Sequence, residues 1–194
     1  LSTTAPSRLT PFPTERSDRM QTPALLAERG FLLRALHDDD LPWLRDLYAS
    51  TRAEEMAPVP WPDLVKRTFL DQQFGLQHQH YLTHFGDTDF LAIEHARRGP
   101  VGRYYLRRAA PEHLIVDISL FPGMRGRGLG QTLIEASQRE AQALDRGMQL
   151  HVSAQNYAAR RLYERLGFVV SGSGATHHLM SWQPTTRAEL SSAG

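Results

Sequence analysis

Cysteine is absent from this chain of 194 residues. Its absence excludes disulfide bonds, thiolate ligands for a metal and a cysteine nucleophile. A chain without cysteine also fits a reducing compartment. We therefore expect a cytoplasmic protein.

Long hydrophobic runs and an excess of charge of one sign are also missing. No stretch approaches the roughly 18 consecutive apolar residues of a membrane span, and residues 1–30 contain no apolar segment of the signal-peptide type. The 22 Lys and Arg residues nearly balance the 21 Asp and Glu residues, which leaves a net charge of +1. We expect neither a nucleic-acid nor a membrane partner, because no large electrostatic field attracts one. A homodimer is left open.

The remaining composition predicts one globular domain between two flexible terminal segments. Hydrophobic residues make up 41% of the chain, which suffices for a single core. Residues 1–30 carry several prolines among Ser, Thr and Arg without apolar periodicity, and we predict a flexible leader there. Residues 184–194 are small and polar, which predicts a flexible tail. The domain then occupies residues 31–183.

Apolar spacing and turn residues predict eleven elements in the order β, α, α, β, β, β, α, β, α, β, β. The predicted strands cover residues 31–34, 89–94, 101–106, 113–120, 149–152, a segment beginning at Phe168, and 178–182. The predicted helices cover residues 41–48, 64–85, 129–144 and 158–166. A helix that crosses between two neighbouring strands makes them parallel. We predict an α/β fold with a mixed, twisted sheet of six to seven strands and helices on both faces.

The most informative segment is residues 118–130, ISLFPGMRGRGLG. An apolar strand stops at a proline and passes through a glycine-rich loop into a helix. Glycines let successive N–H groups point into one concavity, and the helix start adds partial positive charge, so the loop predicts a pyrophosphate site. A Walker loop is excluded because Gln131 and Thr132 follow Gly130 where Lys and Ser/Thr are needed. The spacing Gly-x-Gly-x-x-Gly of dinucleotide-binding folds is not met either.

Two motifs in this sequence resemble those of the GCN5-related N-acetyltransferase (GNAT) family. The spacing Arg125-x-x-Gly128-x-Gly130, after a strand that ends in Leu-x-Pro, resembles the acyl-CoA loop of that family. Residues 156–168, NYAARRLYERLGF, are similar to its Asn-x-x-Ala-x-x-x-Tyr helix followed by Gly-Phe. The resemblance extends over residues 31–182. It implies a single GNAT-like domain whose sheet is splayed between the fourth and fifth strands.

The resemblance also implies residue roles. N–H groups of the loop would hold the pyrophosphate of acetyl-CoA, the preceding strand would pair with the pantetheine arm, and the helix after residue 156 would contact the pantetheine and the sulfur. Tyr163 would protonate the leaving thiolate. The implied cofactor-binding residues are Ile118, Ser119, Leu120, Arg125, Gly126, Arg127, Gly128, Leu129, Gly130, Asn156, Ala159 and Tyr163.

The implied reaction is the transfer of an acetyl group from acetyl-CoA to a primary amine of a small molecule or peptide. The amine attacks the thioester directly and no metal takes part. An alternative of another class is a catalytically idle acyl-CoA-binding sensor or scaffold module. Free-thiol release in the presence of amines separates the two.

Direct attack requires a group that takes a proton from the ammonium form of the acceptor. Asp117 and Glu94 are the candidates for this catalytic role, and His95 and His113 stay as alternatives. Strand alternation predicts that Asp117 shares a face of its strand with Ile115 and Ser119.

Overall fold

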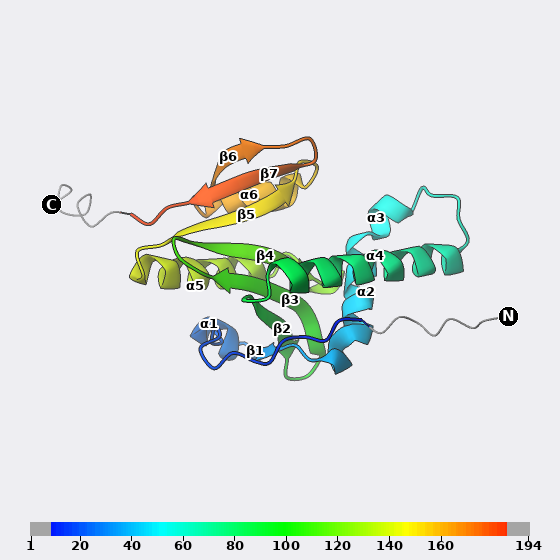
Figure 1. Ribbon diagram of the computed structural model, residues 1–194, viewed down its shortest axis with the longest axis horizontal. Coiled ribbons are helices and arrows are strands. Elements are labelled where there is room, and N and C mark those ends of the chain that lie inside the picture. The colour runs from blue at the N-terminus through cyan, green and yellow to red at the C-terminus, as the bar shows by residue number, and fades with distance from the viewer. Residues whose placement is uncertain (1–8, 186–194) are drawn as a thin grey trace.

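The computed structural model describes residues 9–185, which form a seven-stranded mixed sheet with helices on both faces (Figure 1). The strand order is β1-β2-β3-β4-β5-β7-β6. The strands are β1 (Phe31–Ala35), β2 (Asp89–His95), β3 (Gly99–Arg108), β4 (Glu112–Leu120), β5 (Gly147–Ser153), β6 (Val169–Ser173) and β7 (His177–Trp182). The helices are α1 (Ala24–Ala27), α2 (Leu41–Thr51), α3 (Ala53–Met56), α4 (Asp63–His84), α5 (Leu129–Ala143) and α6 (Tyr157–Arg165). The predicted α/β class and the mixed sheet are confirmed.

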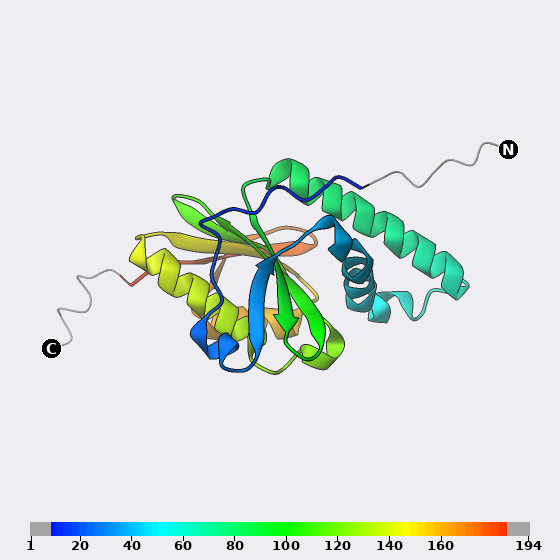
Figure 2. The same cartoon turned by 90° about the horizontal axis from the view of Figure 1, so that it is seen from below.

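Helices on the two faces divide the core into two clusters. In Figure 2, α4 and α5 lie on opposite sides of the strands. One cluster joins α5 and α6 to residues from all the strands but β6, and the other joins α2 and α4 to β2 and β3. Strand alternation sends the neighbours Tyr104 and Tyr105 into different clusters. We call the two sides of the sheet the α5 face and the α4 face.

The sheet opens between β4 and β5. These two strands are parallel and pair over only four residues, from Glu112 opposite Gly147 to Ile115 opposite Leu150. Beyond that point β4 stays paired with β3, and β5 stays paired with β7. The inner edges of both strands therefore lack a ladder partner over residues 116–120 and 151–153. This is the predicted splay between the fourth and fifth strands.

A β-bulge at Val116 changes which residues of β4 share a face. The ladder with β3 skips Val116. Ile115 and Ile118 consequently both pack on the α5 face, whereas Asp117 is hydrogen-bonded to α4 and to Ser119. The prediction that Asp117 shares a face with Ser119 is confirmed. The prediction that it shares a face with Ile115 is wrong, because the extra residue reverses the alternation.

The predicted leader is packed onto the sheet over the part that the structure describes. Met20 and Leu26 are buried in the α5-face cluster. The amide of Met20 donates to the carboxylate of Asp89 at 2.8 Å, and the ring of Phe12 meets that of His78 edge-on, with centroids 4.8 Å apart. These contacts are made by individual side chains at irregular spacing. The segment therefore shows no apolar periodicity in the sequence. Residues 1–8 and most of the predicted tail lie outside the described residues.

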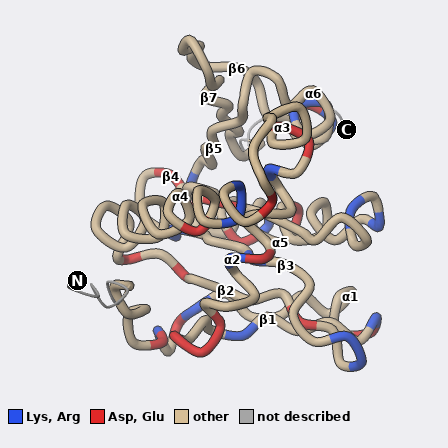
Figure 3. The backbone as a smooth tube through the Cα atoms, turned by 90° about the vertical axis from the view of Figure 1, so that its right-hand side faces the viewer, with Lys and Arg blue, Asp and Glu red and all other residues tan. Residues whose placement is uncertain are grey.

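Charged residues of both signs are interspersed along α4 and the loops beside β1 and β2 (Figure 3). Within residues 9–185, no helix combines the length and the apolar character that a membrane crossing requires.

His113 lies where β4 and β5 are still joined, opposite Met148. The side chain is fully buried, and neither ring nitrogen has a hydrogen-bond partner among the described residues. Burial is the largest influence and lowers the pKa of His113. The residue therefore belongs to the core below the splay and cannot exchange protons with a ligand there.

The packing of the N-terminal segment predicts a contrast between two adjacent leucines of α1. Leu26 is fully buried and Leu25 is 57% exposed. Leu26→Ala should lower the free energy of unfolding by about 2–5 kcal/mol, because it leaves a cavity in the core, and Leu25→Ala by less than about 0.5 kcal/mol. Urea unfolding measures both. Equal effects would mean that α1 does not pack on the core.

Burial of His113 predicts a pH dependence of stability. Unfolded histidine binds a proton below about pH 6.5, whereas the buried ring resists protonation, so the unfolded chain binds more protons as the pH falls and stability decreases. His113→Met should remove this loss, which amounts to at most about 1.4 kcal/mol per pH unit. Urea unfolding at pH 7 and pH 5.5 provides the measurement. His177→Met, at an exposed position, is the control, and the same gain in both variants would refute the assignment to His113.

Candidate active site

The glycine-rich loop connects β4 to α5. A short 3-10 turn, Pro122–Met124, follows β4 and leads to Gly126 and Gly128, whose φ angles are +70° and +77°. These left-handed angles favour glycine over residues with a side chain. A Cβ at either position would have no contact within 4 Å among residues 9–185. Glycine is thus required here by the backbone angle, and the space above the loop is open.

Six successive amides of this loop, those of residues 126–131, point to no hydrogen-bond acceptor within residues 9–185. The last three belong to the first turn of α5, where N–H groups have no partner inside the helix. The left-handed glycines extend the series into the loop. Free amides combined with the positive end of a helix dipole form a site for an anion such as a phosphate.

Two arginine contacts fix the shape of the loop. The Nε of Arg125 donates to the carbonyl of Leu120 at 3.0 Å, which ties the loop to the end of β4. Arg29 donates from Nη2 to the carbonyl of Arg127 at 2.9 Å. The side chain of Arg127 is exposed beside the free amides. The loop therefore adds positive charge around its amides.

The start of α6 presents Asn156. Its side-chain oxygen caps the helix by accepting from the amide of Ala159 at 3.1 Å, which favours the helix start. The side-chain NH₂ group of Asn156 has no partner among the described residues, and the residue is exposed. Asn156 therefore caps the helix and still has two donors for a ligand.

Tyr163 lies two turns further along α6. It is 8% exposed and belongs to the core cluster that also contains Val152, with Ile118 packed against it. Its hydroxyl has no hydrogen-bond partner within residues 9–185, yet it is not fully enclosed. Burial, with a smaller contribution from the charge of Asp117, raises the pKa of Tyr163 to about 12. The hydroxyl is therefore a protonated donor at neutral pH, on the α5 face of the splay.

The helix that carries Tyr163 is held against α5. The side-chain amide of Gln138 donates to the carbonyl of Leu166 at 2.7 Å. This bond joins the middle of α5 to the end of α6, so the glycine loop and Tyr163 belong to one rigid face of the domain.

Asp117 lies on the opposite, α4 face and is surrounded by donors. One carboxylate oxygen accepts from Arg103 Nε at 3.2 Å and Ser119 Oγ at 2.7 Å, and the other accepts from Arg103 Nη2 at 2.9 Å and the Tyr81 hydroxyl at 3.0 Å. Arg103 is buried and also donates to Gln77 on α4 at 2.7 Å. Four donors already occupy the two carboxylate oxygens. The arrangement joins β3, β4 and α4 and does not present a free carboxylate to a ligand.

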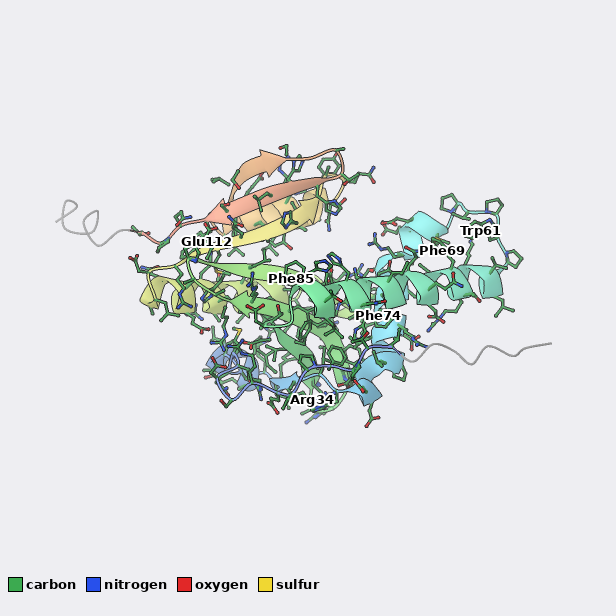
Figure 4. All side chains as sticks on the ribbon, viewed as in Figure 1. Arg34, Trp61, Phe69, Phe74, Phe85 and Glu112 are labelled. Atoms are coloured by element: carbon green, nitrogen blue, oxygen red, sulfur yellow. The ribbon has the colours of Figure 1, made fainter. Side chains whose placement is uncertain are left out.

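Glu94 is not brought to the splay. It forms an ion pair with Arg34, which also binds both oxygens of Asp40 at 2.8 Å. Figure 4 places Arg34 towards the β1 edge of the sheet. Strand β3 separates β2 from β4, and adjacent strands lie about 4.8 Å apart, so Glu94 is about 10 Å from the line of β4. His95, on the same strand, packs edge-on against Phe31.

The end of β5 contributes a histidine that no sequence motif singled out. Leu150 and Val152 pack on the α5 face, so alternation turns His151 to the α4 face. The residue is exposed and follows directly after the last β4–β5 pair.

A comparison with protein families finds a match over residues 44–168, to the acetyltransferase (GNAT) family. Mycothiol acetyltransferase of Frankia casuarinae is 30% identical over 144 residues, which are 73% of this chain and 37% of that protein. The 5-NmdU N-acetyltransferase of Pseudomonas phage PaMx11 is 40% identical over 73 residues, which are 37% of this chain and 51% of that protein. The matches thus span about a third to a half of the length of these curated relatives.

Solved structures share the fold. The PaiA N-acetyltransferase from Thermoplasma acidophilum in complex with coenzyme A superposes with a TM-score of 0.61 at 17% identity, over 79% of this chain and 98% of that one. A spermidine N-acetyltransferase from Vibrio cholerae in complex with CoA and spermine superposes with a TM-score of 0.53 at 22% identity, over 80% of this chain and 96% of that one. Because the family match covers more than half of the chain and the fold agrees, the chain belongs to the acetyltransferase (GNAT) family.

Proposed function

We propose that this protein is an acetyl-CoA-dependent N-acetyltransferase that acetylates a primary amine of a small molecule or peptide. The proposal depends most on one observation: the loop after β4, a strand whose inner edge is unpaired, and the first turn of α5 together present six free amides, those of residues 126–131. Membership of the GNAT family supports it. Its relatives and structural neighbours named above are acetyltransferases.

The loop suits the pyrophosphate of coenzyme A. Free amides of residues 126–130 and the helix dipole of α5 offer hydrogen bonds and positive charge to an anion. Arg125 and Arg127 would add charge at the rim, since both side chains are exposed. No other described residue lies within 4 Å of a Cβ built at Gly126 or Gly128.

The splay suits the pantetheine arm. Residues 118–120 have an unpaired inner edge, and a chain that contains amides can hydrogen-bond to such an edge as an added strand does. Asn156 has a free NH₂ group on the same side of the sheet as Tyr163. An N–H group of residues 118–120 directed at the thioester carbonyl would stabilise the oxyanion of the transition state.

The reaction then needs positioning and proton transfer. The nitrogen of the neutral amine attacks the thioester carbonyl, a C–N bond forms and the C–S bond breaks. Tyr163, whose pKa is about 12, keeps its proton and donates a hydrogen bond to the departing sulfur. The sulfur leaves as a thiol with the one proton that the attacking nitrogen loses. A base takes the earlier proton, whose removal converts the ammonium form of the acceptor into the neutral amine.

An assay of free-thiol release distinguishes this function from an idle acyl-CoA-binding module. The purified chain is supplied with acetyl-CoA and a panel that contains a polyamine, an amino sugar and a peptide with a free amino terminus. We expect amine-dependent release of CoA thiol. Binding of CoA in calorimetry without release for any amine would instead favour the idle module.

Replacement of Tyr163 by Phe tests the role of the hydroxyl. Turnover should fall by more than about tenfold, because the leaving sulfur loses its donor, while the Kd for CoA stays within about twofold. Tyr157→Phe, on the exposed side of the same helix, is the matched control and should retain wild-type turnover. Unchanged turnover for Tyr163→Phe would remove Tyr163 from the mechanism.

Replacement of Gly128 by Val tests the loop. At φ +77° a β-branched residue is strained and should turn the amides away from the anion. We expect no detectable CoA binding in calorimetry. The control is Gly123→Val, since a Cβ there also meets open space but φ is not left-handed. Retained affinity in Gly128→Val would show that CoA binds elsewhere.

A further inference from the structure

The proposed reaction lacks a proton acceptor among the residues that the sequence suggested. Four donors occupy the carboxylate of Asp117. Glu94 is paired with Arg34 two strands away. His113 is sealed in the core below the splay. His95, on the same strand as Glu94, packs against Phe31. None of these four residues presents a free proton acceptor to the gap between β4 and β5.

His151 is the side chain that alternation and register place there. Both of its neighbours along β5 pack inward on the α5 face, so its imidazole projects from the α4 face. Its partner on β7 is Leu179, which lies on the same face. The imidazole is exposed and forms no hydrogen bond or ion pair with any residue of the described range 9–185. It is therefore free to bind a ligand.

The position of His151 along β5 matches the start of the splay. Ile115 and Leu150 form the last pair between β4 and β5, so His151 is the first residue of β5 beyond it. Tyr163 borders the splay from the α5 face. A thioester between the strands would thus have the hydroxyl on one side of the sheet and the imidazole on the other. An amine that approaches from the α4 face would meet His151 first.

We propose that His151 is the general base of the acetyl transfer, an assignment that rests on the proposed function. The neutral imidazole takes a proton from the ammonium of the acceptor. The free amine attacks the thioester carbonyl, the C–N bond forms and the C–S bond breaks. The proton that the nitrogen still loses goes to the sulfur, which leaves as a thiol, and the imidazolium returns its proton to solvent.

Other titratable groups on this face define the surroundings of His151. Asp117 lies on β4 across the splay, held by Arg103, and Tyr81 on α4 donates to that carboxylate. His177 lies further along β7, opposite Ser153. The carboxylate of Asp117 stays paired with Arg103 and forms no hydrogen bond or ion pair with His151 among the described residues.

His151→Gln keeps a polar side chain and removes the imidazole. With the amine that the wild type acetylates best, kcat/KM at pH 7 should fall by about 100-fold or more, while the Kd for CoA stays within about twofold. The remaining activity should rise about tenfold per pH unit between pH 6 and 9, because only amine already neutral in solution then reacts. The wild-type kcat/KM should depend less steeply on pH than that of the variant, because the base accepts a proton from the ammonium form of the amine.

His178→Gln is the matched control. His178 is paired with Val152 and therefore lies on the opposite face of the sheet, so its rate and pH profile should equal those of the wild type. A wild-type rate and pH profile for His151→Gln would overturn the assignment.

A second measurement does not depend on turnover. The ring resonance of His151 is identified by its absence from the NMR spectrum of His151→Gln, and CoA is then added to the wild-type protein. Changes in the resonances of both the amides of residues 126–130 and the His151 ring support the proposal. If the loop amide resonances change and the His151 ring resonance does not, CoA binds as proposed but the assignment of His151 is overturned. If neither responds, the proposed cofactor site fails and the assignment of His151 fails with it.

Discussion

The separation of β4 from β5 after four paired residues is the constraint on which the site depends. Each strand can leave the other because its outer edge is fully engaged, β4 with β3 and β5 with β7. Backbone groups on the inner edges give up hydrogen bonds that a continuous sheet would supply, and buried groups of this kind must find other partners. A ligand with amides of its own can supply them, so the same feature that weakens the sheet leaves backbone groups to which such a ligand can bind.

The buried ion pair of Arg103 and Asp117 helps to keep β4 in place. Such a pair rarely adds net stability, but losing one partner leaves a charge without compensation. Here Arg103 from β3 and Tyr81 from α4 both bind Asp117 next to the bulge at Val116. The network fixes the bulged part of β4 against the helix that covers it. Asp117 is the only acidic residue of β4 beside the splay, and its carboxylate serves this structural network.

Much of the fold could be predicted from the sequence, because apolar periodicity reports which faces of helices and strands are buried. The loop could be predicted too, since glycine angles and the start of α5 determine where its amides point. The bulge at Val116 could not, because counting alternate residues assumes an unbroken ladder. His151 was missed for a related reason. Its place beside the splay follows from the register of β5 with β4 and from the face that α5 and α6 leave uncovered, and neither is visible in a single strand.

The two faces of the splay differ in a way that would give the proposed reaction a direction. On the α5 face, the core surrounds most of the Tyr163 side chain and burial raises its pKa, so the hydroxyl stays a donor. On the α4 face beyond Asp117, β5 is exposed at His151, and water and an amine can reach it. A donor belongs beside the leaving sulfur and an acceptor beside the entering nitrogen, since charge of opposite sign develops at the two positions. The acetyl group would therefore pass through the splay from the enclosed face to the open one.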